Sequence, residues 1–305
     1  MTVIVRPWDG RPIGKPGIIS GMPIDTYHSA KACVEPSISS SGLRRIFTAS
    51  PRHYWANSPY NPKRVDDSET DALILGRAAH HLLFGQDDFK KLFVVRPATL
   101  GGEKWNGNRS ACRIWLEDRA KEGRCVITEG QLEQVRGMAE SLFEEPLVKA
   151  GILNGSIETS WFCKHQKTGI WLKARPDASP NDSLDFADLK TTASVEWDDI
   201  QRSIFKFGYY VQAGLLAMIV RALHGRDMNS FTLIFIEKSP PFDTAIVSLK
   251  ESDIARGIRA AEQSIAKFAE CLASGKWPGR YSEHADARYL EMREFDQKRI
   301  DERLS

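Results

Sequence analysis

The spacing of apolar residues predicts helices in both halves of the chain. From residue 70 to residue 84, apolar side chains recur every three or four positions, which is the period of one face of a helix. The stretch 251–274 has the same period and predicts a long amphipathic helix. Further helices are expected from residue 37 to the break at Ser50-Pro51, and at 110–121, 129–143, 195–205 and 208–224.

Short apolar runs rich in β-branched and aromatic residues predict the strands. They lie at 93–95, 156–163, 170–176, 184–190, 231–236 and 244–249. Turn-forming residues at 178–183 separate two of these runs, so we expect the two runs to form a hairpin. Strands interleaved with helices predict an α/β fold, with a central mixed β-sheet flanked by helices and with helical additions from the N-terminal half.

The chain divides into three segments by composition. Residues 1–36 contain repeated Pro and Gly and are expected to be an irregular arm. Residues 37–280 contain no internal repeat and no obvious linker, which predicts one compact domain. Residues 281–305 are highly charged and predict a solvated helix or a frayed end. Within the domain, 97–110 is expected to be a long polar loop of a kind that is often functional.

The overall composition is that of a soluble globular protein, with 42% hydrophobic and 27% charged residues in 305. No apolar run reaches the roughly 18–20 residues of a membrane-spanning helix, and the first residues do not resemble a signal peptide, so no membrane partner is expected. The five cysteines are scattered without a Cys-x-x-Cys pair, which argues against disulfides and zinc or iron–sulfur sites and favours a cytoplasmic setting. The net charge of +2 means that any DNA-binding surface must be local.

Two carboxylates and one lysine are expected to converge at the predicted hairpin. Asp177 ends one strand, while Asp188 and Lys190 stand two positions apart on the other and therefore share a face. Carboxylate oxygens suit Mg²⁺ or Mn²⁺, and a divalent ion beside a lysine suits phosphodiester hydrolysis. The alternative interpretation is a surface ion pair on a strand.

Further candidates lie before and after this hairpin. His80 stands four residues after Gly76 on a predicted helix, and Glu158 lies on the strand before the hairpin. Tyr210 and Gln212 lie on the helix that follows the hairpin. Each of them alone also has an ordinary interpretation, as a core histidine, an exposed strand residue or a packing residue.

The order of these residues resembles the PD-(D/E)XK nuclease superfamily. Pro176-Asp177 and Asp188-Leu189-Lys190 are similar to its signature. The full order of His, Glu, Pro-Asp, Asp-x-Lys and Tyr-x-x-Gln resembles the branch that includes RecE (exonuclease VIII) and RecB-type nucleases, with a core of the lambda-exonuclease type. The resemblance runs from about residue 37 to 272. The chain has no four-cysteine cluster and no Walker A sequence, and both absences favour a stand-alone nuclease.

The resemblance implies a site for two Mg²⁺ ions, for which Mn²⁺ can substitute. Asp177, Asp188 and the backbone carbonyl of Leu189 would bind metal. His80 and Glu158 would complete a second metal site or position its waters. Two such ions could stabilise the attacking and the leaving oxygens together.

The resemblance also implies a function. Lys190 would orient the nucleophilic water and stabilise charge on the phosphate, and Gln212 and Tyr210 would hold the substrate backbone or the lysine. The enzyme would digest linear double-stranded DNA 5′→3′ and leave 3′ overhangs for a RecT-like annealing partner, in phage or prophage recombination in the cytoplasm of a bacterial host. A ring-shaped homo-oligomer, a trimer or tetramer, is implied as well. The candidate phosphate contacts are Arg44, Arg45, Arg77, Lys104 and Arg109.

Two alternatives to an exonuclease stay open. One is a sequence-specific or structure-specific endonuclease built on the same core. The other is a non-catalytic DNA-binding protein that retains the fold. The presence of Asp177, Asp188 and Lys190 together argues against the second alternative, because a decayed site usually lacks at least one such residue.

Overall fold

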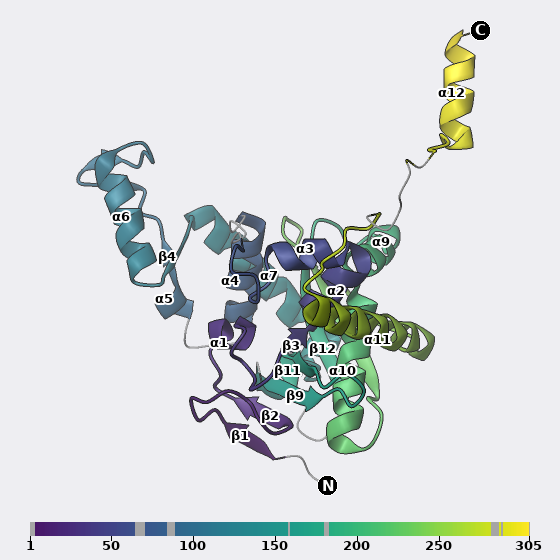
Figure 1. Cartoon of the computed structure of the whole chain (residues 1–305). Helices are drawn as coiled ribbons and strands as arrows, with labels where there is room; N and C mark the ends of the chain where they lie inside the picture. The colour runs from purple at the N-terminus through teal and green to yellow at the C-terminus, as the bar shows by residue number, and fades with distance from the viewer. Residues whose placement is uncertain are drawn as a thin grey trace.

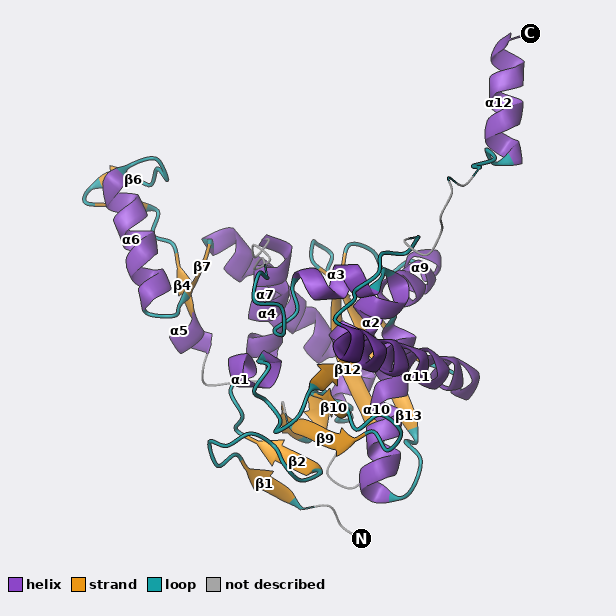
Figure 2. Cartoon of the chain, in the orientation of Figure 1, coloured by secondary structure: helices purple, strands orange, loops and turns teal. Residues whose placement is uncertain are grey.

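Two five-stranded sheets with helices on their faces form the body of the molecule (Figures 1 and 2). The computed structural model describes residues 4–64, 71–83, 89–157, 159–179, 183–281, 287 and 289–304. The first sheet has the order β1-β2-β9-β10-β3, with strands Val5–Pro7, Gly17–Ser20, Ser160–Lys164, Trp171–Ala174 and Ser37–Ser39. The second has the order β14-β13-β12-β11-β8, with strands Thr244–Ser248, Ser230–Glu237, Asp185–Thr192, Ala178–Ser179 and Ser156–Ile157.

Both sheets are mixed. In the second sheet β12 and β13 run parallel, while the other neighbouring strands run antiparallel. The α/β class with mixed sheets is therefore confirmed, although the sheet is divided in two. The helices around the sheets are α1 Ile24–His28, α2 Ser40–Thr48, α3 Pro51–Ala56, α4 Asp71–Leu83, α7 Glu129–Glu144, α8 Pro146–Lys149, α9 Trp197–Phe207, α10 Tyr209–His224 and α11 Glu251–Ser274.

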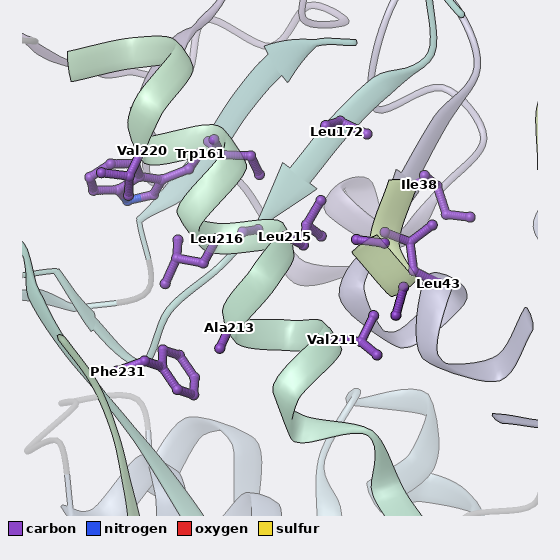
Figure 3. Close-up of a cluster of buried hydrophobic side chains, with 14 of the residues drawn as sticks. Ile38, Leu43, Trp161, Leu172, Val211, Ala213, Leu215, Leu216, Val220 and Phe231 are labelled. Carbon is purple, nitrogen blue, oxygen red and sulfur yellow. The ribbon is translucent and has the colours of Figure 1, made fainter. Parts of the chain in front are cut away.

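Helix α10 lies at the centre of the largest core. Figure 3 shows Val211, Leu215 and Val220 of α10 among side chains from both sheets and from α2. The helix is apolar on most of its surface, as expected for a helix buried on several sides. The opposite face of the second sheet packs against α4 and α7, so strand β12 is covered on both faces.

Two glycines allow α10 and α11 to cross with their backbones in contact. A Cβ atom on Gly257 of α11 would lie 1.8 Å from the carbonyl oxygen of Tyr210, and one on Gly214 of α10 would lie 2.1 Å from the carbonyl carbon of Gly257. No side chain fits between the helices at this point. The two glycines therefore fix how closely α10 and α11 approach each other.

Residues 89–128, which we call the lobe, stand away from this body (Figure 1). The lobe contains α5 Phe89–Leu92, β4 Phe93–Val95, β5 Thr99–Leu100, β6 Glu103–Lys104, α6 Ser110–Lys121 and β7 Cys125–Ile127. Strands β4 and β7 pair in parallel and form its stalk. The segment expected to be a polar loop, 97–110, thus contains a short antiparallel hairpin.

The sequence predicted most helices correctly, and α4, α6, α7, α9, α10 and α11 all begin and end within a few residues of the expected bounds. A capping box at Thr128 starts α7. The tail contains an exposed helix, α12 Glu294–Leu304, within the segment expected to be a solvated helix or a frayed end. The division into domains stays a prediction.

Two expectations about the strands are corrected. The segment 1–36 is not an irregular arm, because β1 and β2 extend the first sheet through antiparallel pairing of β2 with β9. The hairpin before β12 is not formed by β10, which pairs with β9 and β3 in the first sheet. Instead the two-residue strand β11 pairs with β12, at Ala178 and Ala187. The turn residues predicted that the chain reverses before β12, but they did not predict which strand pairs with β12, because strand pairing depends on segments far away in the chain.

Among the described residues, no single helix has the length and apolar character of a membrane span. The pair α9 and α10, bent by 60°, passes such a test only when the two helices are taken together.

Candidate active site

Strand β12 carries a buried carboxylate next to a lysine. Asp188 is only 2% exposed, and its Oδ2 atom forms an ion pair with Nζ of Lys190. Both side chains share a strand face with Phe186, which packs in the core around α10. The alternation expected from the sequence therefore holds, and the ion pair is buried rather than on the surface.

Asp177 reaches the same place from the residue just before β11. Its Oδ2 atom accepts a hydrogen bond from the backbone N–H of Leu189, at 2.7 Å. Its Oδ1 atom lies 2.9 Å from Nε2 of His80 on α4. A Cβ atom on Gly76 would lie 3.3 Å from Oγ1 of Thr191, so the small residue lets α4 approach β12. The spacing of Gly76 and His80 is therefore explained by packing, because Gly76 lets α4 approach β12 and His80 of the same helix contacts Asp177.

Gln212 joins the site from α10. Its Nε2 atom donates a hydrogen bond of 2.6 Å to Oδ1 of Asp188. Its Oε1 atom is buried without a hydrogen-bond partner among the residues that the structure describes. A buried amide oxygen of this kind is costly unless another group binds it. The side chain of Gln212 therefore holds Asp188 through its amide nitrogen, while its amide oxygen can still accept a hydrogen bond.

The tyrosine at the site is Tyr209 and not Tyr210. Nζ of Lys190 lies 5.1 Å from the centre of the Tyr209 ring. The ring of Tyr210 lies instead beside Phe47, with centres 6.3 Å apart. Residues three apart on a helix share a face, whereas residues two apart do not. The spacing from Gln212 could therefore have indicated Tyr209.

Arg44 of α2 also lies at the site. Its guanidinium carbon is 5.7 Å from the centre of the Tyr209 ring, and its Nη1 atom donates a hydrogen bond to the carbonyl of Phe207. Its positive charge favours the ionised form of Asp188. Nε of Arg44 is buried with no partner in the described part of the chain. A second cation, which the sequence suggested only as a phosphate contact, thus lies beside the lysine.

Burial and mutual repulsion set the ionisation of the carboxylates. Burial raises the pKa of Asp188, and the negative charge of Asp177 raises it further, so that the pKa lies above its usual range. Burial also raises the pKa of Asp177, but the positive charges of His80 and Lys190 outweigh burial and lower it overall. Burial lowers the pKa of Lys190, yet the two carboxylates outweigh this and raise it. Lys190 is therefore an ammonium ion at neutral pH.

The donor set fits a hard cation with few protein ligands. Across the residues that the structure describes, no three His, Cys, Asp or Glu side chains are placed so that they could hold a metal ion by themselves. Magnesium commonly binds through one or two carboxylates and keeps several waters. Asp177 and Asp188 supply two such carboxylates, and a cation beside them would offset the repulsion that raises the pKa of Asp188.

The other predicted residues are distributed as follows. Glu158 lies outside the described residues, so its role stays a prediction. Arg45 donates a hydrogen bond to Asn57 on an exposed surface, and Arg77 lies over the ring of Phe93. Lys104 and Arg109 lie in the lobe.

A pocket of about 250 Å³ gives access to Asp177 and His80. Its wall includes Arg175, His28 and the serines at the start of α2. A neighbouring pocket shares His28 and part of this serine segment, and it is lined by Lys173. Burial lowers the pKa of Lys173 to about 8, so an anion bound in that pocket would favour its charged form.

Comparison with known proteins agrees with this geometry. Residues 39–290 match the model of a PDDEXK-like domain of unknown function (DUF3799). Among solved structures, the chain is similar to a "putative exonuclease" from Eubacterium rectale, with 14% sequence identity, 90% of this chain and 97% of that chain covered, and a TM-score of 0.60. At that identity the likeness shows the shared fold. A search of curated proteins finds no match. The expected superfamily is thus confirmed, while the RecE-type branch stays a prediction.

Proposed function

We propose, from the premise that the chain belongs to the family of PDDEXK-like domains, that the protein is a divalent-metal-dependent nuclease that degrades linear double-stranded DNA from its ends. One observation carries the proposal: Asp177, Asp188 and Lys190 meet in one buried cluster. PD-(D/E)XK nucleases generally use divalent metals. The fold shared with a protein described as an exonuclease favours action at DNA ends over internal cleavage.

The chain's own residues have separate tasks in this proposal. Asp177 and Asp188 would hold Mg²⁺, with the Leu189 carbonyl and Glu158 as further candidate ligands. The cation would stabilise the negative charge that develops on the phosphate. His80 holds Asp177 through its Nε2 atom, and Gln212 holds Asp188 through its Nε2 atom.

Lys190 would contribute a positive charge next to the scissile phosphate. Its ammonium group lies between the carboxylate of Asp188 and the ring of Tyr209, which restricts its position. Arg44 adds a second charge from α2, with an unused Nε–H. Such fixed charges stabilise a transition state more than mobile ones do, because they need no reorganisation during the reaction.

The more specific part of the proposal, which covers polarity, metal ions, partner and assembly, rests on the resemblance to RecE-type nucleases. Digestion would run 5′→3′ and leave 3′ overhangs for a RecT-like annealing protein in phage or prophage recombination in a bacterial cytoplasm. Two Mg²⁺ ions would act together, with Mn²⁺ as a substitute. A ring of three or four copies would enclose the DNA. A ring would also reduce the need for positive charge, since enclosure retains the substrate without strong attraction.

We expect the purified protein to degrade linear duplex DNA with Mg²⁺ and to leave a covalently closed circle intact. Parallel reactions on duplexes labelled at the 5′ or the 3′ end would give the polarity. Excess EDTA should stop the reaction, and added Mg²⁺ or Mn²⁺ should restore it. Cleavage of the closed circle at a similar rate would instead support an endonuclease. Cleavage that continues in EDTA would contradict the metal assignment.

Replacement of Tyr209 by leucine should lower the cleavage rate at saturating DNA about 2- to 30-fold, because a cation–π contact contributes about 0.5–2 kcal/mol. Tyr210→Leu is the matched control and should leave the rate nearly unchanged, since that ring faces Phe47. Thermal unfolding of both variants shows whether either change acts through stability. Equal losses of rate in two folded variants would argue against the role of Tyr209.

A further inference from the structure

The lobe concentrates the positive charge of the chain. Residues 89–128 contain nine Lys or Arg and four Asp or Glu, a net charge of +5, whereas the whole chain has a net charge of +2. The rest of the protein therefore carries a net charge of −3. A local excess of this size attracts phosphate even when the whole molecule is nearly neutral.

Part of this charge is neutralised within the lobe. Arg109 pairs with Glu103 at 2.9 Å and donates a hydrogen bond to the carbonyl of Lys104, so it ties the β5–β6 hairpin to α6. Arg119, Lys121 and Arg124 also pair with acidic neighbours. Arg109 is thus mainly structural. The sequence could not separate it from Lys104.

Beyond the base of the lobe, three exposed cations have no acidic partner among the described residues. They are Arg96, Lys104 and Arg113, which come from the end of the stalk, the hairpin and α6. A fourth such cation, Lys90, lies at the base of the lobe in α5. Solvated cations that need not break an ion pair can bind phosphate at little cost. Arg96, Lys104 and Arg113 all belong to the lobe, which projects away from the sheets (Figure 1).

The tryptophans of the lobe are already engaged with one another. The rings of Trp105 and Trp115 pack edge to face, with centres 5.4 Å apart. Arg96 lies over Trp105 and Arg119 lies over Trp115. One face of each ring is therefore covered by an arginine, which disfavours the stacking on bases that single-strand binding uses. Contacts to the phosphate backbone remain as the main mode of binding.

The base of the lobe is anchored beside the site. The lobe is followed directly by α7, which packs against α4, the helix that carries His80. The stalk is held by hydrogen bonds from Arg124 to the carbonyls of Lys90 and Phe93. DNA held by the lobe would therefore lie near the entrance to the site.

We propose that the lobe is an arm that grips the phosphate backbone of duplex DNA outside the catalytic site, through Arg96, Lys104 and Arg113. The proposal rests on the proposed nuclease function for its substrate. The grip is independent of base sequence and contributes to DNA affinity, while the chemical step depends on the buried cluster around Asp188.

The test compares two double variants that remove the same charge. Lys104→Gln with Arg113→Gln alters the lobe. Lys15→Gln with Lys167→Gln alters exposed lysines in the β1–β2 and β9–β10 connections of the first sheet. Binding of a labelled blunt duplex is measured by fluorescence anisotropy in EDTA between 50 and 200 mM salt. The lobe variant should reduce the slope of log affinity against log salt by about 2, so that it loses about tenfold less affinity than wild type across this range. The control variant should keep the wild-type slope.

Cleavage at saturating DNA separates this proposal from the function itself. The lobe variant should keep the wild-type rate at saturation and need more DNA to reach it. An unchanged salt slope in the lobe variant, or an equal fall in the control, would overturn the proposal. A wild-type protein that binds duplex DNA through the lobe but does not cleave it would contradict the nuclease function and still support the lobe as a DNA-binding arm. Stronger loss of affinity for a single strand than for the duplex would show that the arm grips single strands instead.

Discussion

Replacement of Lys190 by alanine, or of Asp188 by asparagine, is expected to lower DNA cleavage by at least about 100-fold, because each change removes a fixed charge from the reacting phosphate or its metal. Asp188 is buried and forms an ion pair with Lys190, so each change also leaves the other residue without this partner. The measurement is the initial rate on linear duplex DNA with Mg²⁺ at saturating DNA.

Asp185 offers a matched control on the same strand. It lies three residues before Asp188, is exposed, and accepts a hydrogen bond from Ser230. Asp185→Asn should therefore cleave DNA at nearly the wild-type rate. Calorimetric titration with Mn²⁺ separates the metal-binding role of Asp188 from the role of Lys190 at the phosphate. Asp188→Asn should lose metal binding, whereas Lys190→Ala should retain it. A folded Lys190→Ala protein with wild-type activity would show that the lysine has no part in the chemistry.

Replacement of Gly257 by alanine is expected to lower the free energy of unfolding by about 3 kcal/mol, at the upper end of the usual cost of overpacking. The added Cβ atom would lie 1.8 Å from the carbonyl oxygen of Tyr210, so α10 and α11 must move apart. Because α10 carries Gln212, the cleavage rate of any protein that still folds should fall as well. Denaturation by urea, followed by circular dichroism, gives the change in stability.

Gly130 provides the control for this substitution. It also lies in a helix, α7, but the nearest atom to an added Cβ would be Oγ1 of Thr128, at 4.0 Å. Gly130→Ala should therefore leave stability unchanged or raise it by up to about 1 kcal/mol, through helix propensity. If Gly257→Ala were equally harmless, the two helices would not be in backbone contact.

The sequence predicted that Asp177, Asp188, Lys190 and His80 would converge, but it did not predict every neighbour of this cluster. Asp188 and Lys190 follow from alternation along a single strand, and Asp177 and His80 follow from their order in the chain. Tyr209 stands three residues before Gln212, so the period of a helix could have indicated it, but the sequence interpretation chose its neighbour Tyr210. Arg44 had no signal that separated it from Arg45, because its position depends on how α2 packs.

The same distinction applies to the fold. Helices such as α11 have a period that is visible in one stretch of sequence, and their bounds were predicted closely. The strand partners of β10 and β12 could not be found in this way, because each strand pairs with segments far away in the chain. The polar and glycine-rich start of the chain hid β1 and β2, whose short runs give little periodicity.

The parallel pairing of β12 with β13 has a consequence for the order in which the protein becomes active. Strand β12 needs a neighbour that the ribosome makes about 40 residues later, and α10 needs the crossing with α11, later still. A growing chain that ends before α11 therefore has the sequence of the site without its scaffold. We infer that chains ending before α11 lack a formed site, so that the proposed nuclease activity can appear only after α11 has been synthesised.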